Sequence, residues 1–266
     1  MDGLLSVTAL TVGYRVPVVR EATFSLQQGK LTGLLGRNGS GKTTLLRGLT
    51  GGARVFGGSV SCEGRDLLLC SDRERARHLA LLSQRRELPE GLRVREVIAM
   101  GRYAHRGIFG GGERERALVD GAARRFGIAD LLDADCAALS EGQRQLVQLA
   151  RVAVQEAPVL LLDEPNSSLD IENTHRLFSQ VRRLADEEGC AVLSVLHDPA
   201  LALRWCDRLL LLLDGRLSEA VSVSRTPPEE LERFLQQLYP ALKLKRDRET
   251  GILLCILQES SETALL

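Results

Sequence analysis

A glycine-rich loop near the start of the chain has the residue types and spacing to hold a chain of phosphates. Residues 36–43 fit the pattern G-x-x-x-x-G-K-[ST], in which glycines allow consecutive backbone N–H groups to point at phosphate oxygens. The lysine adds a positive charge, and the threonine hydroxyl is a ligand for Mg²⁺. The residues expected to contact a nucleotide are Gly36, Asn38, Gly39, Ser40, Gly41, Lys42, Thr43 and Thr44.

Two elements must position this loop. Residues 31–35 predict a buried strand, and residues 43–49 predict a helix. A helix that begins inside the loop points its N-terminus, where backbone N–H groups lack partners, at the anion. The loop in this context therefore predicts a nucleoside-triphosphate site.

A second candidate segment, residues 158–165, is an apolar run that ends in two acids. Such a run predicts a parallel strand that is buried on both faces and has its carboxyl end at a ligand crevice. We expect Asp163 to hold Mg²⁺ directly or through water, and Glu164 to orient and polarise the attacking water as a general base. Taken alone, the segment also fits a core strand that ends at a charged turn.

A third segment, residues 139–143, begins a predicted helix that runs to about residue 155. Ser140 and Gln143 fit the capping-box pattern S-x-x-Q at a helix start. Gly142 would weaken the first turn and expose backbone. Both interpretations hold together, because a capped helix N-terminus with bare backbone is itself an anion site.

In this order, the segments resemble the ATPase subunit of an ATP-binding-cassette (ABC) transporter. Residues 36–43 match the Walker A loop of that family, and residues 159–164 match its Walker B strand. Residues 139–143 stand at the signature motif L-S-G-G-Q, and residues 167–170 match the D-loop. The resemblance covers roughly residues 4–240.

The resemblance assigns roles to three further residues. Gln84 follows an apolar stretch and matches the Q-loop glutamine, whose amide oxygen would reach Mg²⁺ or the attacking water. His197 follows the predicted strand 191–196 and matches the switch histidine, which would hydrogen-bond the γ-phosphate. Tyr14 stands where an aromatic ring stacks on adenine. Without the resemblance, these residues also fit a surface glutamine, a structural histidine and a core or edge tyrosine.

The resemblance also implies a head-to-tail dimer that sandwiches two ATP molecules. Ser140, Gly142 and Gln143 of one copy would then contact the ATP bound by the other copy. Hydrolysis would be in-line attack by water, with Lys42 and Mg²⁺ neutralising charge. Glu141 departs from the signature glycine; it favours the helix N-terminus but would repel a γ-phosphate, so we leave it out of the ATP contacts.

Composition excludes several classes of protein. The 35 lysines and arginines balance 35 aspartates and glutamates, whereas a nucleic-acid binder normally has a basic excess. No apolar run approaches the about 18–20 residues of a membrane span, and the N-terminus has no signal-peptide pattern. We therefore expect a peripheral protein, held by a partner at the cytoplasmic face of the plasma (inner) membrane. The six cysteines form no C-x-x-C pair, which favours reduced thiols over a metal site or disulfides.

The order of strand-like and helix-like segments predicts an α/β fold. We expect a P-loop NTPase core with a mostly parallel sheet, an N-terminal antiparallel β subdomain and an inserted helical subdomain. The ABC ATPase domain would occupy residues 1–240, with the helical subdomain at about 88–156. Residues 226–231 predict a capped helix start, and residues 241–266 would form a C-terminal extension with a small β-element.

The predicted helical insert carries a clue to transport. Residues 93–105 are similar to a stretch in importer ATPases for iron-siderophore, haem and vitamin B12. The arginines form either a solvated charged surface or a contact surface for a permease loop near anionic lipid. They are Arg85, Arg86, Arg93, Arg95, Arg102 and Arg106.

These observations predict an ATPase that powers bacterial uptake of a metal chelate, an iron-siderophore or haem. Its partners would be a second copy, an integral-membrane permease and, indirectly, an external substrate-binding protein that helps select the cargo. A vitamin B12 importer and an exporter ATPase are the alternatives. A translation factor usually carries two cassettes, and a DNA-repair ATPase needs a long coiled coil for which Lys42 and Asp163 lie too close. A non-catalytic regulator is disfavoured by Glu164 and His197 together.

Overall fold

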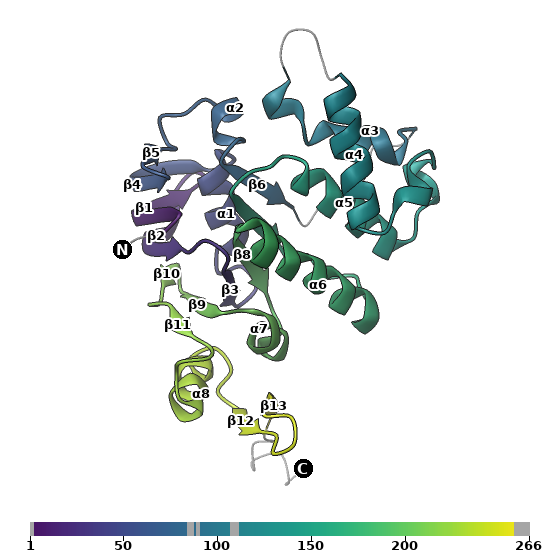
Figure 1. The fold of residues 1–266 in the computed structure, drawn as a ribbon. Helices are drawn as coiled ribbons and strands as arrows, with labels where there is room; N and C mark the ends of the chain where they lie inside the picture. Colours follow the sequence, from purple (N-terminus) through teal and green to yellow (C-terminus); the bar gives the residue numbers. More distant parts are fainter. Residues whose placement is uncertain (1–2, 84–87, 89–90, 107–111, 258–266) are drawn as a thin grey trace.

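The computed structural model describes residues 3–83, 88, 91–106 and 112–257, which form two large packed sheets, a separate two-stranded sheet and a set of helices (Figure 1). The first sheet is antiparallel, in the order β2-β1-β4-β5. Its strands are β1 (Leu5–Gly13), β2 (Pro17–Leu26), β4 (Arg54–Cys62) and β5 (Arg65–Asp66). The predicted antiparallel N-terminal subdomain is therefore confirmed.

The second sheet has the order β10-β9-β3-β8-β7-β6, and β11 also pairs with β9. Its five long strands run parallel, and the short strands β10 and β11 are antiparallel to β9. The strands are β3 (Leu31–Gly36), β6 (Leu79–Leu82), β7 (Val159–Asp163), β8 (Ala191–Leu196), β9 (Arg208–Leu213), β10 (Arg216–Leu217) and β11 (Val221–Ser222). The predicted mostly parallel sheet is confirmed.

The central strands are apolar at every position because both of their faces are covered. In β7, Val159 and Leu161 join a core with the antiparallel sheet, whereas Leu160 and Leu162 join a core with the helices on the other face. All five residues of β7 are buried. Successive side chains of a strand point to opposite faces, so a strand between two cores reads as an unbroken apolar run.

Helices cover both faces of the central sheet. Helix α1 packs between the two sheets, and α5 and α6 pack on the opposite face. The helices are α1 (Lys42–Thr50), α2 (Asp72–Arg75), α3 (Val94–Met100), α4 (Glu113–Arg125), α5 (Glu141–Ala153), α6 (Ile171–Glu188), α7 (Pro199–Trp205) and α8 (Pro228–Gln236). Three short 3₁₀ helices are η1 (Tyr103–His105), η2 (Ala129–Leu131) and η3 (Cys136–Ala138).

Between β6 and β7, all elements that the structure describes are helical. Helices α3, α4 and α5 pack together on the side of the molecule away from the antiparallel sheet (Figure 1). At another end, α8 and the hairpin β12 (Leu242–Arg246) and β13 (Leu253–Leu257) lie below the central sheet, and β13 contacts α7. The domain limits at 88–156, 1–240 and 241–266 stay predictions.

Two local expectations are wrong. Helix α8 starts at Pro228 with Pro227 as its N-cap and has no side-chain cap, so Thr226 does not cap it. The two prolines set helical φ without needing their missing N–H groups. Arg102 also does not belong to the expected surface of arginines: it is 8% exposed and donates to the Val154 carbonyl. The ion pairs are Arg93–Asp133, Arg95–Asp133, Arg102–Glu156 and Arg106–Glu115.

This pairing makes Arg102 a structural residue that joins the insert to the chain before β7. Arg85 and Arg86 lie outside the described residues. Among the long helices of the described part, none is apolar enough to span a membrane.

Candidate functional site

Three neighbouring strands bring the candidate catalytic residues to one edge of the central sheet. In the order β3-β8-β7 the strands are parallel, with Leu35 opposite Leu196 and Asp163 opposite Val195. The phosphate loop follows β3, His197 follows β8, and Glu164 follows β7. Carboxyl ends of parallel strands meet at a shared crevice, so residues far apart in sequence lie close together.

The crevice is a cavity of about 600 Å³. Residues of the loop form one wall, Glu164 and His197 form the other, and Val18 of β2 adds an apolar patch. The residues that line it are Val18, Asn38, Gly39, Gly41, Lys42, Thr43, Thr44, Glu164 and His197. Eight of these nine were predicted as site residues from the sequence, and Val18 was not.

The loop needs glycine at two positions in particular. Gly41 is the N-cap of α1 with φ 107°, a region that side chains rarely adopt. A Cβ there would lie 2.8 Å from Cγ2 of Val19. At Gly36, a Cβ would lie 2.7 Å from Oγ of Ser40. The backbone therefore turns tightly enough to present its N–H groups to an anion.

The side chains of Lys42 and Ser40 are positioned to bind an anion. The Lys42 side chain is 5% exposed, and its Nζ donates to the carbonyls of Gly36 and Arg37 at 2.8 and 3.0 Å. Burial lowers the pKa of Lys42, while the charges of Glu164 and Asp163 oppose that shift. Oγ of Ser40 is buried and has no hydrogen-bond partner among the described residues. A phosphate oxygen would satisfy both groups, so the loop fits a triphosphate.

Thr43 and Asp163 fit Mg²⁺. Oγ1 of Thr43 donates to Oδ1 of Asp163 at 3.1 Å, so two oxygen ligands of the kind that Mg²⁺ prefers already lie together. Burial raises the pKa of Asp163, with the Glu164 charge adding to the shift and the Thr43 hydrogen bond opposing it. A bound cation would favour the ionised carboxylate. The third predicted metal ligand, Gln84, lies outside the described residues.

The candidate base and the candidate switch histidine contact each other. Nε2 of His197 lies 2.6 Å from Oε1 of Glu164. Glu164 has φ 50°, a strained value for a residue with a side chain. The carbonyl of His197 accepts a hydrogen bond from Oη of Tyr239 at 2.6 Å. Tyr239 was not identified from the sequence, because no local pattern connects the residue after α8 with the end of β8.

The predicted capping box at residues 140–143 is present. Oγ of Ser140 accepts a hydrogen bond from the backbone N–H of Gln143 at 3.3 Å, and Oε1 of Gln143 accepts one from the backbone N–H of Ser140 at 2.9 Å. Gly142 has a packing role as well, because a Cβ there would lie 2.6 Å from Oδ1 of Asn173. Asn173 in turn donates to the carboxylate of Asp170 through its backbone and side-chain nitrogens.

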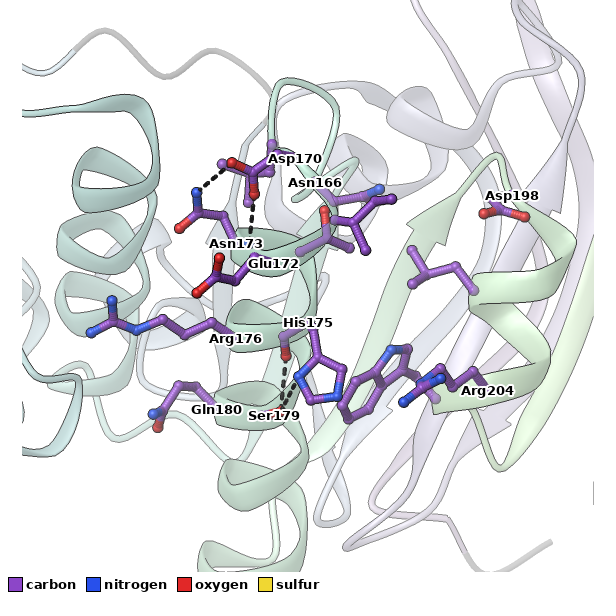
Figure 2. A pocket seen from close by; sticks show the side chains of 15 residues that line it. Asn166, Asp170, Glu172, Asn173, His175, Arg176, Ser179, Gln180, Asp198 and Arg204 are labelled. Carbon is purple, nitrogen blue, oxygen red and sulfur yellow. Dashed lines mark hydrogen bonds between the residues drawn. The ribbon is translucent and has the colours of Figure 1, made fainter. Parts of the chain in front are cut away.

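The packing of Gly142 against Asn173 joins the signature segment, residues 139–143, to the D-loop, residues 167–170. Figure 2 shows Asp170 and Asn173 at the start of α6, on the wall of a second pocket of about 980 Å³ between α6 and α7. The signature residues Ser140, Gly142 and Gln143 are not among the described residues that line the loop pocket. Their contact with a nucleotide stays a prediction.

Tyr14 also lies outside the lining of the loop pocket as far as it is described. Its ring is 48% exposed, and its Oη accepts from Nη1 of Arg47 on α1 at 3.0 Å. An exposed ring held in place is compatible with stacking on a base, and that role too stays a prediction.

The fold and the site define a P-loop nucleoside-triphosphate-binding protein. The family model described as "ABC transporter" matches residues 19–167. The chain belongs to the ABC transporter family.

Similar proteins include import ATP-binding proteins. The Cobalamin import ATP-binding protein BtuD of Halobacterium salinarum is 41% identical over 81% of this chain, which spans about half (54%) of that relative. The Hemin import ATP-binding protein HmuV of Pseudomonas entomophila is 42% identical over 75% of this chain and 78% of its own length. The Iron(3+)-hydroxamate import ATP-binding protein FhuC of Bacillus subtilis is 33% identical over 87% of each.

Solved structures agree on the fold. A chain of an inward-facing ABC transporter of the metal-chelate type superposes with a TM-score of 0.82 at 23% identity, covering 98% of this chain and 100% of its own. A dimeric ATP-binding cassette with ADP and Pi superposes with a TM-score of 0.73 at 22% identity, covering 82% and 98%. The predicted P-loop fold is thereby confirmed.

Proposed function

We propose that this chain is the ATP-hydrolysing subunit of a bacterial ABC importer. The observation that carries the proposal is the meeting of Lys42, Asp163, Glu164 and His197 at one sheet edge, within a cavity that fits a triphosphate. An ion-binding or structural role would not require a buried lysine, a base and a histidine around one loop.

In the proposed mechanism, the loop binds the phosphates through backbone N–H groups and Lys42. Glu164 accepts the proton of the attacking water, and His197, which lies 2.6 Å from it, orients the γ-phosphate and the base. Thr43 and Asp163 would hold Mg²⁺, with Gln84 as a further ligand; the ion, when bound, neutralises charge on the phosphates. The protein contributes positioning and electrostatics rather than covalent chemistry.

The proposed active unit is a head-to-tail dimer. Ser140, Gly142 and Gln143 would reach the ATP held by the second copy, and Tyr14 would stack on the adenine. The capping box at the start of α5 supports this arrangement, since Ser140 and Gln143 hold an ordered helix N-terminus, a position that favours an anion. The dimeric cassette with ADP and Pi offers a precedent for the same fold.

The proposed cargo is a metal chelate. The names of the relatives cover cobalamin, hemin and an iron(3+)-hydroxamate, each of which is a metal ion held by an organic chelator. We favour an iron-siderophore or haem, with cobalamin as the second candidate because BtuD is among the relatives with 41% identity. The chain would lie peripherally at the cytoplasmic face of the plasma membrane, bound to a permease. An external binding protein would deliver the cargo to that permease.

Isolation from native membranes tests the transport assignment. The tagged chain, extracted in mild detergent from the cells that make it, is expected to bring with it a polytopic membrane protein and to hydrolyse Mg-ATP. The surface variant Glu249→Gln serves as a matched preparation, since that side chain lies in an exposed turn. Recovery of the active chain with soluble proteins alone, in both preparations, would overturn the importer assignment.

The hydrogen bond from Tyr239 to the His197 carbonyl yields a separate prediction. We expect Tyr239→Phe to lower kcat about threefold to tenfold with little change in KM for ATP, because one hydrogen bond contributes about 0.5–1.5 kcal/mol and this one holds the carbonyl of His197. Steady-state kinetics measure the split. Tyr103→Phe, at a ring that is 73% exposed, is the control and keeps wild-type kcat; equal kcat in both variants contradicts the positioning role.

A further inference from the structure

Three potential metal ligands meet at the junction of the two sheets, away from the nucleotide site. Cys62 ends β4, Glu63 begins the turn to β5, and His78 directly precedes β6. Sγ of Cys62, a carboxylate oxygen of Glu63 and a ring nitrogen of His78 all lie within 4.8 Å of one another. Two of the residues come from the antiparallel sheet and one from the edge of the central sheet.

The polar atoms of this cluster are not satisfied by each other. Nδ1 of His78 is buried and has no hydrogen-bond partner in the described part of the chain. Its distance to Oε2 of Glu63 is 3.7 Å, which is too long for a hydrogen bond. Two ligands held at about 2.0–2.1 Å from one tetrahedral zinc ion stand about 3.3 Å apart. The observed gap is therefore near the spacing that a shared ion requires.

Backbone contacts hold the three positions in place. The Glu63 N–H donates to the Leu4 carbonyl, and Glu63 has φ 50° in the turn. The His78 carbonyl accepts from the Val159 N–H, which fixes His78 against β7. The ligand positions thus depend on two sheets that are each hydrogen-bonded, so little rearrangement is needed to bring the side chains onto an ion.

Burial and charge select the class of metal. The Cys62 side chain is fully buried, whereas the Glu63 side chain is 53% exposed and gives a path from solvent. One thiolate and one carboxylate cancel the charge of a divalent cation, so the complex is neutral in a buried setting. Sulfur, imidazole and carboxylate ligands together suit zinc and similar borderline-soft ions rather than Mg²⁺.

We propose that Cys62, Glu63 and His78 form a binding site for a single Zn²⁺-like cation, with water as the fourth ligand. On binding, the sulfur–metal bond forms and the thiol proton passes to solvent. The ion would tie the β4–β5 turn to the start of β6. The sequence analysis favoured reduced thiols because the cysteines form no C-x-x-C pair. The cluster could not be found from the sequence, because only the fold brings His78 close to Cys62.

Cobalt absorption tests the site directly. The full-length chain is freed of metal with a chelator, exchanged into nucleotide-free buffer and titrated with Co²⁺, then with Zn²⁺ as competitor. We expect one equivalent of Co²⁺ to give a thiolate-to-metal charge-transfer band in the near ultraviolet, and Zn²⁺ to abolish it. None of the described residues that line the nucleotide cavity is a cysteine, so metal at that cavity gives no such band.

Three variants and a control decide the outcome. Cys62→Ser removes the band, and Glu63→Gln and His78→Gln each weaken Co²⁺ binding about tenfold or more. Cys70→Ser, at a half-buried cysteine outside the cluster, keeps it. The Glu63 side chain is 53% exposed, so we expect the Glu63→Gln variant to fold even if Cys62→Ser does not. Absence of the band in the wild-type chain, or its persistence in Cys62→Ser, or equal affinity in Glu63→Gln, overturns the proposal.

Discussion

Glu164→Gln is expected to slow ATP hydrolysis about 100-fold or more while ATP binding is retained. The amide has the size of the carboxylate but cannot accept a proton from water, and loss of a general base costs about 10²–10⁴ in rate. Lys42 and the phosphate loop keep their places, because they lie on α1 and between β3 and α1, and Lys42 is held by the Gly36 carbonyl. Release of phosphate from Mg-ATP measures the rate, and fluorescent-nucleotide titration measures binding.

A matched surface change guards this interpretation. Glu249→Gln replaces another glutamate with the same amide in an exposed turn, so we expect wild-type turnover and affinity. If Glu164→Gln retains wild-type turnover, Glu164 is not the base. If it instead loses ATP binding, its role is in holding the nucleotide and the proposed division of labour is wrong.

Ser140→Asp is the second change with a large expected effect. Aspartate caps a helix as well as serine does, so α5 keeps its N-terminus. The added charge would face the γ-phosphate bound by the other copy, and two like charges about 4 Å apart repel by about 4 kcal/mol at an effective dielectric of about 20. A barrier raised by about 4 kcal/mol slows hydrolysis about 1000-fold, and we expect the ATP affinity of the separate chain and the free energy of unfolding to stay nearly unchanged.

The neutral cap Ser140→Asn separates charge from shape. It retains the cap without adding charge, and we expect most of the hydrolysis to survive. Comparable losses in the aspartate and asparagine variants would mean that the hydroxyl itself, rather than proximity to a partner's phosphate, sets the rate. Wild-type hydrolysis in Ser140→Asp would mean that the cap does not face a nucleotide at all.

The local parts of the site could be predicted from the sequence because each is a short segment whose geometry follows from its residue types. Glycine spacing defines the phosphate loop, and the apolar run before Asp163 defines a strand buried on both faces. Once the strands are parallel, their carboxyl ends share an edge. The meeting of Lys42, Asp163 and His197 follows from that topology.

Contacts between distant segments could not be predicted in the same way. The hydrogen bond from Tyr239 to His197 and the packing of Gly142 on Asn173 depend on how α8 and α6 dock. Arg102 was misjudged for the same reason, since its guanidinium donates to a carboxylate and a carbonyl that lie about fifty positions further along the chain. A run of arginines in the sequence does not show which of them is buried, because burial depends on tertiary contacts.

The central claim is that two copies close on ATP, one with its loop and the other with its capped helix. The most direct measurement is the molar mass of the Glu164→Gln chain in solution with Mg-ATP. The account predicts twice the 29.2 kDa chain mass with Mg-ATP, the chain mass without nucleotide, and the chain mass again for Glu164→Gln combined with Ser140→Asp despite bound ATP. A double variant that stays dimeric, or a Glu164→Gln chain that binds Mg-ATP and remains a single copy, would contradict it.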